Sequence, residues 1–218
     1  MKADWLHGTP YTMVQPEGIY HFNSDTELLG KFIRVKRSDN VLDVGCGSGA
    51  LLLYAALQKP KSLTGIDLFD EVVAAARFNL EQNGVEAELV RTRVQDFQGR
   101  FDLIVCNPPY FETKKQELLS EDPLIRAARH SESLPMEELF ASVKRLLKEN
   151  GRFALVQRHQ QTARMLLLAE ANGMAPARMR IAYAGEEKGA RSVLLEFRKG
   201  TCGFAIEKPA FLNRRETF

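Results

Sequence analysis

The tetrad Asn107-Pro108-Pro109-Tyr110 directly follows a short apolar run, residues 101–106, and has a specific chemical use. Two consecutive prolines remove two backbone donors and fix φ, so this segment cannot easily continue a sheet or begin a helix. The Asn107 side chain and the Pro108 carbonyl can then accept hydrogen bonds from a planar NH2 group above the strand. Tyr110 offers a flat face on which a planar base can stack. All four residues are therefore predicted to be catalytic, with an exocyclic amine as the reacting group.

A glycine-rich turn at residues 45–49 lies between an expected strand and an expected helix. Glycines let a ligand approach the backbone closely. With the alanine that follows, the turn also satisfies the dinucleotide-binding pattern, so the turn alone does not choose between ligands. The carboxylate two residues before the first glycine is awkward beside a pyrophosphate but favourable beside an ammonium and a sulfonium group. S-adenosylmethionine carries both cations and no phosphate, which makes it the predicted cofactor. The cofactor contacts predicted here are Asp43, Gly45, Cys46, Gly47 and Gly49.

Further candidate cofactor contacts follow the next strands of the chain. Asp67, at the end of a predicted strand, can accept hydrogen bonds from ribose hydroxyls, and Leu68 can pack on an adenine face. Asp96 can accept from the adenine amino group, and Asn107 is also predicted to contact the cofactor. A lone strand-end carboxylate is more often a solvated cap, and a lone glycine turn is often only a tight connection. Their occurrence in order at strand ends, where open α/β sheets bind ligands, favours one binding site.

The elements that position these residues are read from the apolar runs. Strands are predicted at 41–44, 63–67, 87–92, 101–106, 153–156, 179–183 and 193–197. Helices are predicted at 24–32, 50–57, 71–83, 135–147 and 161–171. Ser24 with Glu27 is the expected cap of the first helix, and Asn150-Gly151 is expected to end the fourth. This alternation predicts an α/β fold with a doubly wound, mostly parallel seven-stranded sheet and an antiparallel edge strand.

Length and composition predict one domain over residues 1–218, with 1–20 an irregular lead-in and 200–218 a C-terminal tail. Thirty Lys and Arg against 28 Asp and Glu give a formal charge of +2, which allows a nucleic-acid partner without demanding one. Three widely spaced cysteines argue against a disulfide framework or a zinc cluster, and no metal is expected. No apolar signal core or membrane-spanning run is seen, so no membrane partner and a cytoplasmic location are expected, with a monomer as the default.

Phe111 directly follows the tetrad, and residues 114–129 form a polar, charged stretch that is predicted to be a mobile loop. Phe111 could help to hold a base, and the basic residues in and after the tetrad loop could contact phosphates. The alternative is that a charge-rich loop is merely solvated. Only the position of this loop beside the tetrad favours a role in substrate binding. The predicted substrate contacts are Phe111, Lys114, Lys115, Arg129, His130 and, at the end of the fifth strand, Arg158.

Together these motifs resemble the class I, Rossmann-like S-adenosylmethionine-dependent methyltransferases of the amino-methylating branch. Residues 43–49 are similar to the first motif of that family, and residues 107–110 to its catalytic motif. The branch includes adenine-N6 enzymes acting on DNA and RNA, guanine-N2 enzymes acting on ribosomal RNA, and glutamine methyltransferases acting on release factors. The tetrad does not separate these substrates.

Flanking segments resemble one branch member, the bacterial tRNA1(Val) adenine-N6 methyltransferase family. Residues 20–29 are similar to its N-terminal motif, aromatic-x-x-[ST]-Asp-x-x-Leu-Leu, and residues 128–138 and 151–158 also resemble it. Through the N-terminal motif the resemblance implies Asp25 as a cofactor contact. It also implies the anticodon loop of a tRNA as substrate, with N6 of an adenine as the methylated atom. The sequence departs from the family at Ser131, where a glutamate is more usual, and in the tail after residue 200.

The tetrad also suggests how a poor nucleophile could react. The lone pair of an aromatic amine is delocalised into the ring. Two acceptors, Asn107 Oδ1 and the Pro108 carbonyl, would favour a pyramidal nitrogen and stabilise the positive charge that develops on it. Placement beside a sulfonium methyl adds the proximity effect, and Tyr110 would hold the base flipped out of its stack. The chemistry needs no nucleophilic side chain and no metal.

Other functions remain open from the residues alone. The same chemistry would suit a protein-glutamine N5 or ribosomal RNA guanine-N2 methyltransferase. An NAD(P)-linked oxidoreductase could use the same turn, but that function would not explain the presence of Asp43 or of the two consecutive prolines. A non-catalytic RNA- or protein-binding module could keep the fold and the ligand without turnover.

Overall fold

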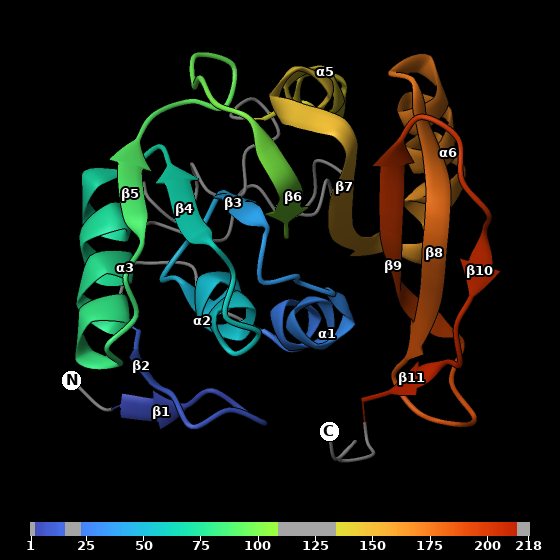
Figure 1. Cartoon of the computed structure of the whole chain (residues 1–218). Helices are drawn as coiled ribbons and strands as arrows, with labels where there is room; N and C mark the ends of the chain where they lie inside the picture. Colours follow the sequence, from blue (N-terminus) through green and yellow to red (C-terminus); the bar gives the residue numbers. More distant parts are fainter. Residues whose placement is uncertain (1–2, 16–22, 109–133, 213–218) are drawn as a thin grey trace, which may run out of the picture.

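The structure, a computed structural model, describes residues 3–15, 23–108 and 134–212, and its main feature is a nine-stranded sheet (Figure 1). The strands of this sheet are β3 (Asn40–Val44), β4 (Ser62–Asp67), β5 (Glu88–Arg91), β6 (Phe101–Cys106), β7 (Leu147–Arg158), β8 (Met174–Tyr183), β9 (Ala190–Lys199), β10 (Ala205–Ile206) and β11 (Ala210–Phe211). The described helices are α1 (Ser24–Phe32), α2 (Ala50–Ala56), α3 (Asp70–Gln82), α5 (Met136–Leu146), α6 (Thr162–Ala171) and the 3-10 helix η1 (His159–Gln161).

The strand order is β10-β8-β9-β7-β6-β3-β4-β5, and β11 also pairs with β8. The strands from β5 to β7 along this order are all parallel to their neighbours. The one antiparallel strand, β9, lies between β7 and β8, inside the sheet. The expectation of seven strands with an antiparallel edge is therefore wrong in count and position, because β10 and β11 extend the sheet beyond β8. Each of these has two residues, too few to give a periodic signal.

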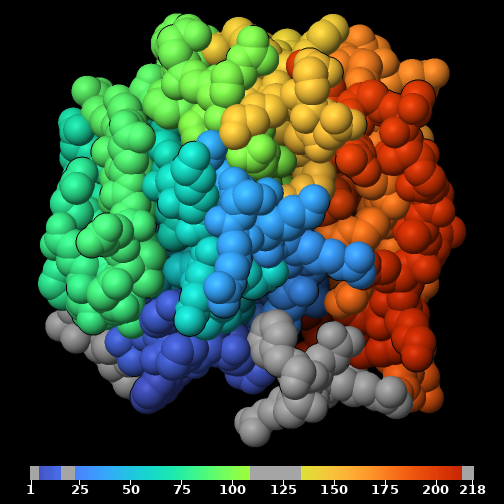
Figure 2. Space-filling view, in the orientation of Figure 1, coloured from blue at the N-terminus to red at the C-terminus, as the bar shows by residue number. Residues whose placement is uncertain are grey.

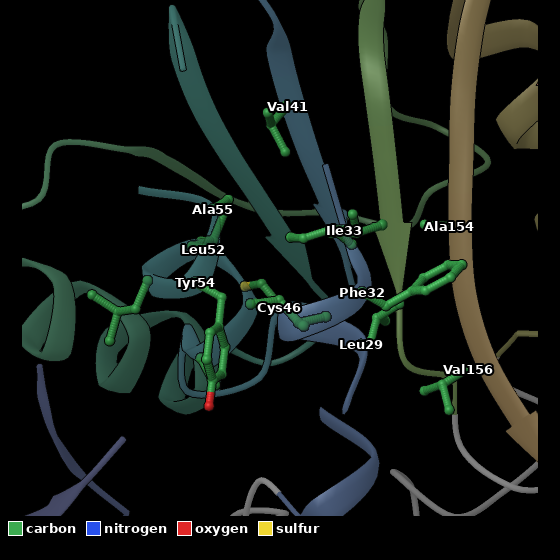
Figure 3. Packing of buried hydrophobic residues seen from close by; sticks show 14 of the residues in the cluster. Leu29, Phe32, Ile33, Val41, Cys46, Leu52, Tyr54, Ala55, Ala154 and Val156 are labelled. Atoms are coloured by element: carbon green, nitrogen blue, oxygen red, sulfur yellow. The ribbon is translucent and has the colours of Figure 1, made fainter. Parts of the chain in front are cut away.

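Helices cover both faces of the sheet, which confirms the doubly wound arrangement. α1, α2 and α3 pack on one face, and α5 and α6 pack on the other (Figure 1). Figure 3 shows part of the first core, to which α1 contributes Leu29, α2 contributes Leu52 and β7 contributes Ala154. In the second core the rings of Phe140 and Phe153 meet edge to face, 5.4 Å apart. Within the described residues, no helix is both long and apolar enough to cross a membrane.

The cap of α1 is Asn23, one residue before the predicted Ser24. Asn23 Oδ1 accepts hydrogen bonds from the backbone N–H groups of Asp25 and Thr26, at 2.9 and 3.2 Å. The Thr26 hydroxyl accepts in return from the Asn23 N–H, which completes a capping box. Asparagine and serine both cap helices well, so residue type does not decide the register. The register of the cap is decided here by the hydrogen bond from the Asn23 N–H to the hydroxyl of Thr26, the third helical residue.

The pair Asn150-Gly151 does not end α5, contrary to expectation. That helix ends at Leu146, and β7 begins at the next residue and continues through the pair. Asn150 has φ +60° inside the strand, and the β6–β7 register shifts between Phe101 and Leu103. A Cβ on Gly151 would lie 2.8 Å from the Lys148 carbonyl oxygen. The Asn-Gly signal therefore marks an irregularity within β7 and not a helix end.

Residues 3–14 are also more regular than the predicted lead-in. β1 (Ala3–Trp5) and β2 (Thr12–Val14) form a small antiparallel sheet. The fully buried Asn79 of α3 holds it, because its side chain accepts from Val14 N at 2.8 Å and donates to Val14 O at 2.9 Å. Three-residue strands depend on such tertiary partners, and local sequence patterns do not reveal them.

The tail after residue 200 joins the sheet through Glu207. Its carboxylate binds the guanidinium groups of Arg34, Arg178 and Arg180 at 2.7, 2.8 and 2.8 Å. Partial burial raises the pKa of Glu207. The hydrogen bond from Arg178 and the positive charge of its guanidinium outweigh this effect and hold the pKa below its usual value. The C-terminal strands, orange to red in Figure 2, form the side of the molecule opposite α3.

Gly30→Ala is expected to lower the free energy of unfolding by about 1–3 kcal/mol. A Cβ at Gly30 would lie 2.2 Å from Tyr54 Cδ2, and the Tyr54 hydroxyl is held by a 2.8 Å bond to the His7 carbonyl. Urea unfolding at constant pH measures the change. Gly189→Ala is the matched control, because a Cβ there meets nothing within 4 Å. Glycine-to-alanine changes inside helices normally stabilise, so a more stable Gly30→Ala protein would contradict this packing.

Candidate active site at the carboxyl edge of the sheet

The candidate site lies where β3, β4 and β6 end. These strands are parallel neighbours, with β3 between the other two. Their carboxyl ends therefore meet at the same edge of the sheet. The glycine turn follows β3, Asp67 is the last residue of β4, and Asn107 directly follows β6. The structure thus brings together three motifs that are far apart in the sequence.

The glycine turn is held by the backbone and keeps open space beside it. The N–H groups of Gly45 and Cys46 both donate to the Ile66 carbonyl, at 2.9 and 3.0 Å. Gly45 and Gly47 have φ values of +70° and +54°, which favour glycine. A Cβ on either residue would meet nothing within 4 Å. Glycine is therefore required here by the backbone conformation, and a ligand has room to approach.

Asp43 is a fully buried carboxylate, and neither of its oxygens has a hydrogen-bond partner among the residues that the structure describes. Burial raises its pKa well above the usual value, and the nearby charge of Asp67 raises it further. A buried polar group without a partner is costly and rare in folded proteins. A cation bound at the glycine turn would relieve this cost. The geometry of Asp43 therefore agrees with the sequence-based expectation of a positively charged ligand.

Asp67 supports the glycine turn directly, which its position in the sequence did not reveal. Its Oδ2 accepts from the Gly47 N–H at 3.1 Å, and its Oδ1 accepts from the Leu68 N–H at 2.7 Å. Burial raises the pKa of Asp67, while the bonds from backbone N–H groups oppose this rise. An ionised carboxylate has about four acceptor positions, so hydroxyl groups of a ligand can still bind to it.

Asn107 is oriented by α1. Its Nδ2 donates to the Thr26 hydroxyl at 2.9 Å. The acceptor end of the amide, Oδ1, has no hydrogen-bond partner in the part of the chain that the structure describes. Pro108 is buried and Asn107 is half-buried. Because the NH2 group is bound to α1, Oδ1 is the end of the amide that could accept from a ligand, and this role stays a prediction of the tetrad.

Two further residues hold the site and were missed by sequence reasoning. Asn79 donates to the Ser48 carbonyl of the glycine turn at 3.0 Å, so it links this turn to β2. The guanidinium of Arg145 donates to the carbonyls of Val94, Gln95 and Phe97, at 2.9, 3.0 and 2.6 Å. A polar residue at a buried helical position is the signal for Asn79. No local signal identifies Arg145, because arginine in the last turn of a helix is common.

Other predicted site residues have different surroundings. Asp96 is exposed in the turn that Arg145 holds. Asp25 is fully buried, and its carboxylate accepts from the Ser192 hydroxyl of β9 at 2.7 Å, so its described contact is with the sheet. Arg158 ends β7. The predicted 114–129 loop and the following predicted site residues lie outside the described residues: Pro109, Tyr110, Phe111, Lys114, Lys115, Arg129 and His130.

Known proteins provide an independent comparison. The methyltransferase small domain family matches residues 11–131. A protein of Shewanella sp. (strain W3-18-1) named tRNA1(Val) (adenine(37)-N6)-methyltransferase is 34% identical over 142 residues, which are 62% of this chain and 58% of that protein. A protein of the same name from Shewanella frigidimarina is 31% identical over 185 residues, 79% of this chain and 72% of that protein. The chain thus spans less than two thirds of the length of the first relative and more than two thirds of the length of the second.

The fold also has counterparts among solved structures. A predicted O-methyltransferase from Agrobacterium tumefaciens superimposes with a TM-score of 0.65 over 88% of this chain and 90% of that one, at 17% sequence identity. At this identity the likeness shows the fold alone. The family match covers the glycine turn, Asp67 and Asn107, which lie at the described edge, and it also covers Asp96. The chain belongs to the methyltransferase small domain family.

Proposed function

We propose that this protein, as one domain over residues 1–218, is an S-adenosylmethionine-dependent methyltransferase acting on N6 of an adenine in a tRNA anticodon loop. The observation that carries the proposal is the Asn107 amide, which lies at the sheet edge that also holds the glycine turn and whose NH2 group is bound to Thr26. The names of the relatives support adenine and tRNA as the substrate class.

The residues at this edge fit the proposed cofactor. The unpartnered Asp43 carboxylate suits a ligand with an ammonium and a sulfonium group. The open space beside Gly45 and Gly47 admits a ligand close to the backbone, and Asp67 can bind ribose hydroxyls. When bound, S-adenosylmethionine supplies an electrophilic methyl group. A dinucleotide fits less well, because its pyrophosphate would lie near a buried carboxylate.

Asn107 and Pro108 act on the amine that receives the methyl group. Asn107 Oδ1 and the Pro108 carbonyl each accept a hydrogen bond from one of the two N–H groups of the amine. The nitrogen lone pair is then directed away from both acceptors. Their dipoles stabilise the positive charge that develops on nitrogen. The proton that nitrogen then loses can pass to water, so this scheme needs no side-chain base. Because the acceptors are fixed before the reaction, little reorganisation is required.

Methyl transfer from radiolabelled S-adenosylmethionine tests the proposed function. Bulk tRNA, ribosomal RNA and total protein serve as separate acceptors, and the labelled product is identified by nucleoside or amino-acid analysis. The proposal predicts label in tRNA as N6-methyladenosine. Label in guanosine or in protein glutamine would assign the same chemistry to another amine. Absence of label from all three, although the protein binds the cofactor, would support a binding module.

Arg145→Lys is expected to raise the dissociation constant of S-adenosylhomocysteine about fivefold. Lysine keeps the charge, but it cannot span the three carbonyls of residues 94–97 that the guanidinium holds. The turn that carries Asp96 should then be less well ordered. Isothermal titration calorimetry measures the change. Arg164→Lys is the matched control, because Arg164 binds Glu137 on the surface, and an equal loss in both variants would contradict the assigned role.

A further inference from the structure

The Asn107 side chain meets a helix that lies 81 residues earlier in the sequence. Thr26, in the first turn of α1, is 6% exposed, and its Oγ1 accepts the 2.9 Å hydrogen bond from Asn107 Nδ2. Within the described residues, this is the hydrogen bond that the Asn107 side chain makes. It joins the start of α1 to the end of β6, the strand that carries the tetrad.

The first turn of α1 is itself firmly held. Asn23 Oδ1 accepts from the Thr26 N–H at 3.2 Å, and the Asn23 N–H donates to Thr26 Oγ1 at 3.5 Å. The neighbouring Asp25 carboxylate accepts from the Ser192 hydroxyl on β9 at 2.7 Å. The hydroxyl that contacts Asn107 is therefore fixed by the helix cap and by the sheet. It can serve as a rigid reference point for the amide.

A primary amide needs such a reference point. Its oxygen and its NH2 group have nearly the same shape but opposite hydrogen-bonding roles, and the terminal torsion has a broad, roughly two-fold profile. If the amide reversed, its NH2 group would face the substrate and could not accept from an amine. In the structure the amide donates from Nδ2 to Thr26 Oγ1, and this bond holds it in the orientation that directs Oδ1 away from that hydroxyl. The Thr26 hydroxyl also accepts from the Asn23 N–H, which fixes the position of Oγ1.

We propose that Thr26 is a positioning residue that sets the orientation of the Asn107 amide and presents its Oδ1 to the substrate amine. The kinetic part of this inference rests on the proposed function. The orientation of the amide does not, and it can be measured without substrate.

Thr26→Val tests the inference, because valine keeps the shape of threonine and removes the hydroxyl. The expected result is a kcat about tenfold lower for methyl transfer to bulk tRNA, with the KM for tRNA and the affinity for S-adenosylhomocysteine within twofold. Thr26→Ser keeps the hydroxyl and should restore kcat to within about twofold. Thr9→Val is the matched control, since the Thr9 hydroxyl also makes two hydrogen bonds, in the turn between β1 and β2. It should leave kcat unchanged.

The side-chain amide resonances of Asn107 provide a readout that needs no turnover. Their 15N–1H pair is assigned by its absence in Asn107→Ala. In the wild type and Thr26→Ser the pair should show slow hydrogen exchange, and in Thr26→Val exchange should be at least tenfold faster. Unchanged exchange in Thr26→Val would overturn the inference whether or not tRNA is the substrate. Faster exchange with unchanged kcat would also overturn it, because the amide orientation would then not matter for transfer.

Discussion

Asn107→Ala is expected to lower kcat for methyl transfer by about a hundredfold to a thousandfold, the usual effect of removing one preorganised group that stabilises a transition-state charge. The reason is that Asn107 Oδ1 is one of two acceptors proposed for the reacting amine. Cofactor affinity should stay within a few fold, because Asp43 and the glycine turn remain intact. Single-turnover transfer to tRNA and calorimetric binding of S-adenosylhomocysteine measure the two effects separately.

Asn107→Asp sharpens this test. A carboxylate keeps acceptor oxygens at the same position, and the Thr26 hydroxyl can donate to it instead of accepting. This variant should therefore retain more activity than Asn107→Ala. Equal activity of wild type and Asn107→Ala would contradict the assigned role. A large loss of cofactor affinity in Asn107→Ala would instead make Asn107 mainly a cofactor contact.

Asp43→Asn is expected to weaken S-adenosylmethionine binding at least a hundredfold while making the ligand-free protein more stable. The buried carboxylate of Asp43 has no hydrogen-bond partner in the described part of the chain, so its charge should destabilise the ligand-free protein. Asparagine is nearly the same size and removes that charge. The ligand then loses the carboxylate proposed to balance its positive charges. Urea unfolding without ligand and calorimetry with ligand should change in opposite directions, and a less stable Asp43→Asn protein would contradict the account.

The sign of the pH effect follows from the raised pKa of Asp43. A carboxyl group with a higher pKa in the folded state than in the unfolded state binds protons more readily when folded. Its destabilising effect is therefore present above the folded pKa and is lost as pH falls toward the usual pKa of aspartate. Asp67 on β4 also has a raised pKa, so the wild type must be compared with Asp43→Asn. The stability advantage of Asp43→Asn should shrink as pH falls, and an advantage that grows would contradict this linkage.

The sequence predicted the parts of the site that have local signals. The tetrad and the glycine turn each follow an apolar strand, Asp67 ends one, and parallel strands bring their ends to one edge. In the structure Asn107, the glycine turn and Asp67 lie at the same edge of the sheet. Residue type and spacing also identified Asp43 as the group that distinguishes between ligands, and its burial without a partner agrees with that interpretation.

The contacts that orient these residues could not be predicted, because they join distant segments. Thr26 and Asn107 are 81 residues apart, and Arg145 holds carbonyls about 50 residues earlier in the chain. The short strands β1, β2, β10 and β11 have two or three residues each, and tertiary pairing forms them where no period is visible. Asn150-Gly151 has the composition of a helix stop, but the strand that pairs with β6 incorporates it instead.

The position of the adenine relative to Asn107 can be seen in a crystal structure with a tRNA anticodon stem-loop and sinefungin, a cofactor analogue that carries an ammonium group in place of the reactive methyl. We expect an adenine turned out of the loop, with its N6 about 3 Å from both Asn107 Oδ1 and the Pro108 carbonyl. The analogue should occupy the space beside Gly45 and Gly47. An adenine bound elsewhere, or an Asn107 amide whose NH2 group faces the base, would contradict this expectation.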